Sequence, residues 1–457
     1  MRYDNNSAVG DSYYKEARTA TIEIEDKNFD PTATTVDITA ALDNGETGTP
    51  QASNFTQIGD IWSATVRFVQ DGDYSITVAT TDLAGNEAED YPLEKFSIDQ
   101  TVPELTIEGV QDKSANKGKV LPVIYCEDNN IDAASFYISL TGANHGETAY
   151  KSTRITSDKS IQVSIADFAH KVECDDLYTL EAGVTDLAGN ETVETIVFSV
   201  NRFGSVYILN DDTQRLVDNF YTNQEQDVVI TEVNVDSLQF KEIDYSYDGS
   251  IITLQEGRDY KVTNQTNVAG WKIYEYRIDK KNFASEGSYV VSIYSEDMAQ
   301  NKSSNKAKGK ELAFVVDKTA PSIVVAGVEN NGQYVEANRN VSVDTQDNIL
   351  LETVEVYVGN QVKASAGRDE LLENDGQLEL ALPGNNENQT LYVVAKDAAG
   401  NTTQTEPIEF LVTSNLFIQW YSNIPLCVGS SVATVGVGGL IIFRKRIPFG
   451  KMFKRVK

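Results

Sequence analysis

The chain of 457 residues is poor in the residue types that most catalytic and metal centres use. It holds two histidines, three cysteines and three methionines. Neither His145 nor His170 lies near a nucleophile signature, and no Cys or His cluster has zinc spacing. No glycine-rich loop follows a strand and opens a helix, so nucleotide binding is not indicated. We therefore expect no enzyme activity.

The sequence also predicts no disulfide bonds in this chain. Cys126 and Cys174 fall in one stretch, and Cys427 lies near the C-terminus. Alignment of Glu25-Asp26 with Glu127-Asp128 places Cys126 where Ile24 stands, facing a core. We interpret Cys126 as a buried thiol that packs as a small apolar residue, in preference to a Cys126–Cys174 bridge.

The chain also lacks a basic surface. Its net charge is −31, and the last 14 residues hold seven Lys or Arg and no acid. An acidic body does not bind nucleic acid by neutralising phosphates. It suits a soluble surface or one that takes up divalent cations.

What the sequence does contain is a repeat. Asp82-Leu83-Ala84-Gly85-Asn86 returns, with variation, at Asp186, Asp297 and Asp397, at intervals of 104, 111 and 100 residues. A fixed period of one small domain marks a tandem array, so we predict four copies of one domain.

The flanks of this motif predict a hairpin. A tyrosine stands eight residues before the Asp at Tyr74, Tyr178 and Tyr289, with Gln389 in the fourth copy. Apolar or small residues then alternate with largely polar ones, and a second strand follows the motif. Gly is favoured in the turn because it reaches positive φ at little cost, so Gln300 in the third copy predicts a different or strained turn.

The segments Asp71-Gly72-Asp73-Tyr74 and Glu286-Gly287-Ser288-Tyr289 predict a tyrosine corner, in which the hydroxyl bonds back to the backbone. Short strands between Asn, Asp and Gly turns are typical of an all-β sandwich. The combination Asp-Gly-x-Tyr, Asp-x-Ala-Gly-Asn, Phe-x-Val-Asp and Thr-x-Pro resembles the bacterial immunoglobulin-like (Ig-like) repeats of Gram-positive surface proteins. The resemblance covers residues 1 to about 413 and implies a stalk or adhesive module.

The predicted fold is thus all-β: a tandem array of four Ig-like β-sandwich domains followed by one C-terminal transmembrane helix. The boundaries that we assign are repeat 1 at 1–99, repeat 2 at 100–201, repeat 3 at 202–317, repeat 4 at 318–413, a juxtamembrane segment at 414–423, the transmembrane helix at 424–443 and a basic tail at 444–457.

The N-terminus does not resemble the beginning of a secreted protein. Met1-Arg2-Tyr3-Asp4 contains no apolar signal region, and Met1 aligns with Pro103 inside the first strand of the second repeat. We therefore expect repeat 1 to be truncated, either because a longer protein continues upstream or because the start codon is misplaced.

The predicted membrane anchor rests on residues 410–443, which carry no charge. Ile424 to Phe443 is long enough to span a hydrocarbon core of about 30 Å. Trp420 and Tyr421 lie on one flank and Arg444-Lys445-Arg446 on the other, which predicts repeats outside the cell and a cytoplasmic C-terminus. A buried apolar element is the alternative, and no Leu-Pro-x-Thr-Gly sorting motif precedes the segment.

Acidic and amide side chains are predicted to meet where one repeat joins the next, because the linker enters each domain beside two of its loops. At the second repeat the residues are Asp99, Asp128, Asn130, Asp186 and Asn190, and at the fourth they are Asp317, Asp347, Asn348, Asp397 and Asn401. Oxygen ligands of this kind bind Ca²⁺. We prefer the alternative that each side chain caps its own turn, because no recognised calcium loop is formed. Asn201 replaces the linker Asp in the third repeat, which predicts the poorest cation site there.

Two functions remain open from the sequence. The first is a non-catalytic, membrane-anchored stalk or adhesin with an extracellular protein or glycan ligand. The second is the non-catalytic repeat and anchor region of a larger secreted surface enzyme. Glycan binding by the repeats themselves is a weaker third possibility, since Trp62, Trp271 and Trp420 do not recur at equivalent positions.

Overall fold

The structure, a computed structural model, describes residues 1–10, 12–89 and 91–415. The predicted transmembrane helix 424–443, the basic tail 444–457 and most of the juxtamembrane segment lie outside these ranges. Within them, no helix is long and apolar enough to cross a membrane. The described chain forms two compact units, residues 1–319 with 398–401, and residues 320–397 with 402 onward.

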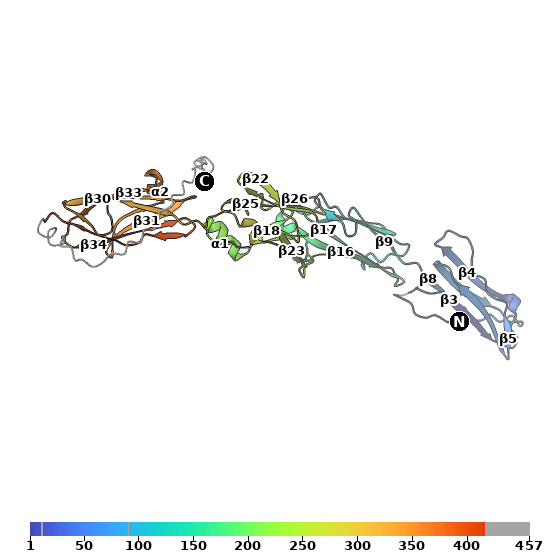
Figure 1. Cartoon of the computed structure of the whole chain (residues 1–457). Coiled ribbons are helices and arrows are strands. Elements are labelled where there is room, and N and C mark those ends of the chain that lie inside the picture. The colour runs from blue at the N-terminus through green and yellow to red at the C-terminus, as the bar shows by residue number, and fades with distance from the viewer. Residues whose placement is uncertain (11, 90, 416–457) are drawn as a thin grey trace. The chain divides into compact units, whose positions relative to one another are not determined.

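Strands dominate repeats 1 and 2 (Figure 1). The strands of repeat 1 are β1 (Arg2–Tyr3), β2 (Tyr13–Tyr14), β3 (Arg18–Glu25), β4 (Thr34–Leu42), β5 (Thr56–Ile58), β6 (Ile61–Phe68), β7 (Gly72–Thr80) and β8 (Tyr91–Ile98). Those of repeat 2 are β9 (Glu104–Glu108), β10 (Ala115–Asn116), β11 (Val123–Glu127), β12 (Tyr137–Gly142), β13 (Gly146–Glu147), β14 (Ser152–Thr156), β15 (Ser160–Ile165), β16 (Asp176–Thr185) and β17 (Glu191–Val200).

Repeats 3 and 4 add one short α-helix each. Repeat 3 contains β18 (Val206–Leu209), α1 (Asp211–Asn219), β19 (Tyr221–Thr222), β20 (Val228–Asn234), β21 (Leu238–Tyr247), β22 (Ser250–Thr253), β23 (Tyr260–Thr266), β24 (Lys272–Ile278), β25 (Gly287–Asp297), β26 (Lys302–Ser304) and β27 (Leu312–Val316). Repeat 4 contains β28 (Ser322–Ala326), β29 (Gly332–Tyr334), β30 (Asn338–Gln346), β31 (Leu351–Val358), β32 (Gln361–Gly367), α2 (Arg368–Glu373), β33 (Gln377–Pro383), β34 (Asn388–Asp397), β35 (Thr402–Gln404) and β36 (Ile408–Val412). Three 3-10 turns lie at Pro31–Ala33, Val172–Cys174 and Lys280–Phe283.

Each repeat divides its first strand between two sheets. In repeat 2, β9 pairs antiparallel with β11, whereas β10 pairs parallel with β17. The two sheets run β14-β15-β11-β9 and β10-β17-β16-β12-β13, and repeats 1 and 3 follow the same plan. In repeat 4 the smaller sheet has three strands, β28-β30-β33. The all-β, Ig-like prediction is confirmed for the described residues.

Buried apolar side chains gather into four clusters within the described residues, one inside each repeat. The alternation that predicted the hairpins explains them. Tyr74, Ile76 and Val78 are buried on one face of β7, while Ser75 and Thr77 are partly exposed on the other. The aromatic side chain after the motif turn completes each core, as Phe198 does against Tyr178 with ring centroids 6.0 Å apart.

The tyrosine corner is present wherever the sequence has the tyrosine. The hydroxyls of Tyr74, Tyr178 and Tyr289 donate to backbone carbonyls four residues upstream, at 2.8, 3.0 and 2.8 Å. Gln389 replaces it in repeat 4 and donates through Nε2 to the Pro383 carbonyl at 3.4 Å.

The motif turn is the same in repeats 2 and 3 despite the change of residue. The Asp186 N–H donates to the Asn190 carbonyl at 2.9 Å, and the Asp297 N–H to the Asn301 carbonyl at 3.2 Å. Gln300 adopts φ +66° where Gly189 has φ +88°. Of the two predicted outcomes the strained turn is therefore the correct one, since a left-handed conformation costs a non-glycine residue roughly 1 kcal/mol.

Repeat 3 contains a polar network inside its core. Glu232 takes a core-facing position in β20 and is fully buried. Its carboxylate accepts bonds from Tyr207 and Ser295 on one oxygen, at 3.1 and 2.5 Å, and from Tyr276 on the other at 2.7 Å. Burial raises the pKa of both tyrosines. These donors satisfy a carboxylate that would otherwise be costly to bury.

Cys126 occupies the matching core position in repeat 2. Its side chain is buried, and both Cys126 and Cys174 are free thiols, as the sequence predicted. Burial also raises the pKa of Cys126 to about 11, so the thiol stays protonated and packs as an apolar side chain.

The tyrosine corner gives a stability prediction. Tyr178→Phe keeps the ring in the core but removes the hydrogen bond to the Cys174 carbonyl, so repeat 2 should lose about 0.5–1.5 kcal/mol of unfolding free energy. Urea denaturation measures it. Tyr137→Phe is the matched control, because Tyr137 is exposed and its hydroxyl bonds only Glu181 on the surface. Equal losses in the two variants would contradict the corner's role.

Candidate cation site at the junction of repeats 1 and 2

The linker between repeats 1 and 2 is held by repeat 1 through backbone and carboxylate contacts. The Asp99 N–H donates to the Tyr14 carbonyl at 3.0 Å. The Asp71 carboxylate accepts from the Gln100 N–H at 3.0 Å and from the Thr101 hydroxyl at 2.6 Å. Asp71 belongs to the Asp-Gly-x-Tyr segment, so the tyrosine corner and the linker are built from one stretch of sequence.

Repeat 2 also binds this linker, through a hydrogen bond to its backbone. The Asn190 amide donates to the Asp99 carbonyl at 2.9 Å and to Asp186 Oδ2 at 2.7 Å. The last residue of the motif repeats this contact further along: Asn301 donates to the Asn201 carbonyl at 2.8 Å and Asn401 to the Asp317 carbonyl at 2.9 Å. The motif therefore closes a turn and also binds the incoming linker.

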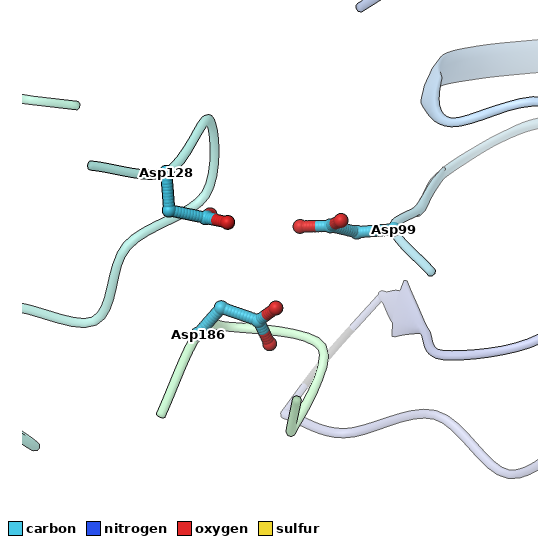
Figure 2. Close-up of side chains that lie close together, drawn as sticks. All are labelled: Asp99, Asp128 and Asp186. Atoms are coloured by element: carbon cyan, nitrogen blue, oxygen red, sulfur yellow. The ribbon is translucent and has the colours of Figure 1, made fainter. Parts of the chain in front are cut away.

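Three carboxylates converge at this point. Figure 2 shows the side chains of Asp99, Asp128 and Asp186 pointing toward one another, from the linker and from two loops of repeat 2. One oxygen of each lies within 4.8 Å of the others. Asp99 and Asp186 are buried, and Asp128 is half-buried. The structure thus brings together the three carboxylates that the sequence predicted for this junction.

Electrostatics make this arrangement costly without a positive charge. Burial, together with the charges of Asp128 and Asp186, raises the pKa of Asp99 to about 6, against the lowering effect of the Asn130 amide. Burial likewise raises the pKa of Asp128. A hard divalent cation bound by oxygen would offset the repulsion.

The same side chains also cap turns, as the alternative interpretation predicted. Asp128 Oδ1 accepts from the Asn130 N–H at 2.6 Å, and Asp186 Oδ1 from the Asn190 N–H at 2.8 Å. The two predicted amides act here as donors rather than as oxygen ligands, since Asn130 Nδ2 donates to Asp99 Oδ2 at 2.9 Å. Capping uses one lone pair of an oxygen, so it does not prevent cation binding.

The predicted set in the fourth repeat stays a prediction. Asp317 belongs to the first compact unit, whereas Asp347 and Asp397 belong to the second. Within the second unit, Asp347 Oδ2 accepts from the N–H groups of Ile349 and Leu350 at 2.9 and 2.8 Å, so it caps its own loop.

Residues 64–202 match the sequence family described as bacterial Ig-like domain (group 3). The matched stretch runs from β6 of repeat 1 through the junction and repeat 2, and it includes Asp99, Asp128 and Asp186. No curated protein matches the chain.

Several solved structures are similar to this chain. A tetra-tandem repeat from the extending region of a large adhesion protein shares 17% identity over 90% of this chain and 98% of that chain, with a TM-score of 0.35. The fibronectin(III)-like modules of CbhA from Clostridium thermocellum share 12% identity over 46% of this chain and 96% of that one, with a TM-score of 0.24.

Sequence reasoning missed several residues that build the junctions of the Ig-like repeats. Asp71 and Asp175 cap the outgoing linkers, and Lys15 Nζ donates to the Gly189 carbonyl of the next repeat at 3.1 Å. Lys117 donates in the same way to the Gln300 carbonyl at 3.3 Å. An acidic residue precedes the corner tyrosine in these repeats, and the sequence assigned it only to the tyrosine corner. Its contact with the linker was not predicted. The lysines left no such signal.

The raised pKa of Asp99 predicts a pH dependence for residues 1–201 in the presence of a chelator. The folded-state pKa of about 6 lies above the ordinary value of 3.8. The stabilising contribution of Asp99 to the free energy of unfolding is therefore complete below pH 3.8 and is lost as pH rises through about 6. Denaturation midpoints across this range measure it. Asp99→Asn should flatten the step near pH 6, and a step of equal size in Asp99→Asn would show that another group titrates.

Proposed function

We propose that this protein is a non-catalytic, cell-surface stalk or adhesin-like protein, in which Ig-like repeats stand outside the cell and residues 424–443 anchor them in the membrane. The observation that carries the proposal is the repeated linker contact. Asn190 and Asn301 each bind the carbonyl of the residue that enters their repeat. Linkers held in this way serve to join domains in series, which is the task of a spacer.

The surface chemistry supports the same role. The net charge of −31 favours a soluble ectodomain that does not bind polyanions. The only tryptophans described by the structure are used inside the protein: Trp62 packs on Phe29, and Trp271 donates to Asp176. Neither forms a repeated sugar platform, so a protein or glycan ligand of the stalk would bind elsewhere.

The second candidate is that these repeats form the non-catalytic end of a larger secreted surface enzyme. The low numbers of histidine and cysteine fit both candidates. Sequencing upstream of Met1 in the genome separates them, because a catalytic domain there would favour the enzyme and further repeats the stalk.

The anchor is tested by deletion. When the chain is expressed in a bacterium behind a secretion signal, the full chain should sediment with membranes, and a chain ending at residue 414 should be released. Protease added to intact cells should digest the repeats and leave a C-terminal tag intact. A chain lacking only residues 444–457 is the matched control and should stay in the membrane fraction. Release of the full chain would refute the anchor.

We also propose that Ca²⁺ stiffens the junction of repeats 1 and 2, because three carboxylates converge there within 4.8 Å. A ligand that binds only the folded form stabilises it by about 2.7 kcal/mol at a hundredfold excess over Kd.

Millimolar calcium should therefore raise the melting temperature of residues 1–201, and EDTA should reverse the rise. The double variant Asp99→Asn and Asp186→Asn should lose the response and keep the fold, since Asn retains a capping oxygen. An unchanged melting temperature in the wild type leaves capping as the sole role of the three carboxylates.

A further inference from the structure

The junction between repeats 2 and 3 has the same backbone contacts as the first but the opposite side-chain polarity. The Asn201 N–H donates to the Asn116 carbonyl at 2.9 Å, as Asp99 does to Tyr14. The Asn301 amide binds the Asn201 carbonyl, as Asn190 binds that of Asp99. The linker side chain, however, is an amide in place of a carboxylate.

This amide lies among acceptors from the next repeat. Asn201 Nδ2 is within 2.8 Å of Asn234 Oδ1, 2.9 Å of Asp236 Oδ2 and 3.0 Å of Asp297 Oδ2. Its Oδ1 accepts from the Gly204 N–H at 3.0 Å. Asn201 is fully buried, so every polar atom of its side chain is used within the protein.

One hydrogen bond between linker and loop runs in opposite directions in the two junctions. In the first, Asn130 of the loop donates to the linker carboxylate of Asp99 at 2.9 Å. In the second, the linker amide of Asn201 donates to the loop carboxylate of Asp236 at the same distance. Asn234 makes the turn-capping contact that Asp128 makes in repeat 2. The second junction therefore carries one carboxylate fewer than the first.

The motif carboxylate is also better satisfied here. Asp297 Oδ2 accepts from the amides of Asn201, Asn234 and Asn301, at 3.0, 3.1 and 3.0 Å. Its other oxygen accepts from the Asn301 N–H at 2.8 Å. Amide donors thus surround the buried charge of Asp297. The matching residue in repeat 2, Asp186, lies beside two other carboxylates instead.

A second contact joins the same two repeats outside the linker. Trp271, in the loop between β23 and β24, donates its indole N–H to Asp176 Oδ1 of repeat 2 at 2.9 Å. Asp176 is fully buried and its other oxygen accepts from the Asn144 N–H at 2.9 Å and contacts His145 Nδ1 at 2.8 Å. The relative position of repeats 2 and 3 is therefore fixed at two separate points.

We propose that the junction of repeats 2 and 3 is a cation-independent lock, in which the linker amide of Asn201 donates to the carboxylates of Asp236 and Asp297, whereas the linker of the first junction places a third carboxylate at the same position. The lock rests on the contacts of Asn201 alone. Only its contrast with the first junction rests on the proposed calcium role there. The chain would then combine one ion-responsive junction with one that holds its geometry at any calcium concentration.

Hydrogen exchange of the full chain, read by mass spectrometry, tests the lock. In the wild type, protection of peptides covering residues 199–206 and 297–303 should be the same in EDTA and in millimolar calcium. Asn201→Asp places a third carboxylate against Asp236 and Asp297, and should lower that protection about tenfold in EDTA. Combining it with Asp236→Asn restores a donor–acceptor pair of the polarity seen at Asp99 and Asn130, and should recover most of the protection.

The matched control is Asn264→Asp, which adds the same charge at an exposed position of β23 and should change nothing at the junction. Calcium-dependent protection of the wild-type junction would overturn the lock whatever the variants do. So would an Asn201→Asp variant with wild-type protection, or a double variant no better than the single one. Peptides covering residues 99–101 report on the first junction in the same samples. Lack of a calcium effect there would refute the cation role and leave the lock standing.

Discussion

The connection between successive repeats depends on a hydrogen bond to the backbone carbonyl of one linker residue. Asp99, Asn201 and Asp317 each directly follow the last strand of one repeat, and the backbone carbonyl of each accepts a hydrogen bond from the side-chain amide of a motif asparagine. Between repeats 1, 2 and 3, this bond holds the motif turn of the following repeat against the linker that leaves the preceding sandwich. The tyrosine corner takes part, since the acid beside it caps the linker from the other side.

Close approach of loops and linker has an electrostatic consequence. Polar side chains that cap turns at the end of a sandwich become buried when the next domain docks, and buried carboxylates must find donors or a positive charge. The first two junctions solve this differently. Around Asp297 three amides supply donors, whereas Asp99 lies beside Asp128 and Asp186 and has a raised pKa. One substitution in the linker, Asp to Asn, accompanies the difference.

The core of each sandwich is easier to predict than the junctions, because apolar and polar residues alternate along its strands. Tyr74, Ile76 and Val78 are buried as the period of two requires, and Phe96 is buried beside Tyr74 on the neighbouring strand β8. Repeat 3 departs most from this pattern. Its core contains Glu232 with two tyrosines and a serine, and a left-handed Gln300 stands in its motif turn. The hydroxyl groups that satisfy Glu232 lie 25, 44 and 63 residues away along the chain, so the sequence of one strand does not reveal them.

The sequence by itself determined the all-β class, the period of the array, the tyrosine corners and the free, buried Cys126, because each depends on contacts that are local or repeat at a fixed interval. It also indicated that Asp99, Asp128 and Asp186 would meet. It missed α1, although Asn210 caps that helix and Asp211 and Asp212 follow. Only the tertiary structure decided which amides donate and which carboxylates face one another. Residues such as Asn201 and Asp236 lie 35 positions apart, and the sign of their contact depends on two domains docking, which no local pattern encodes.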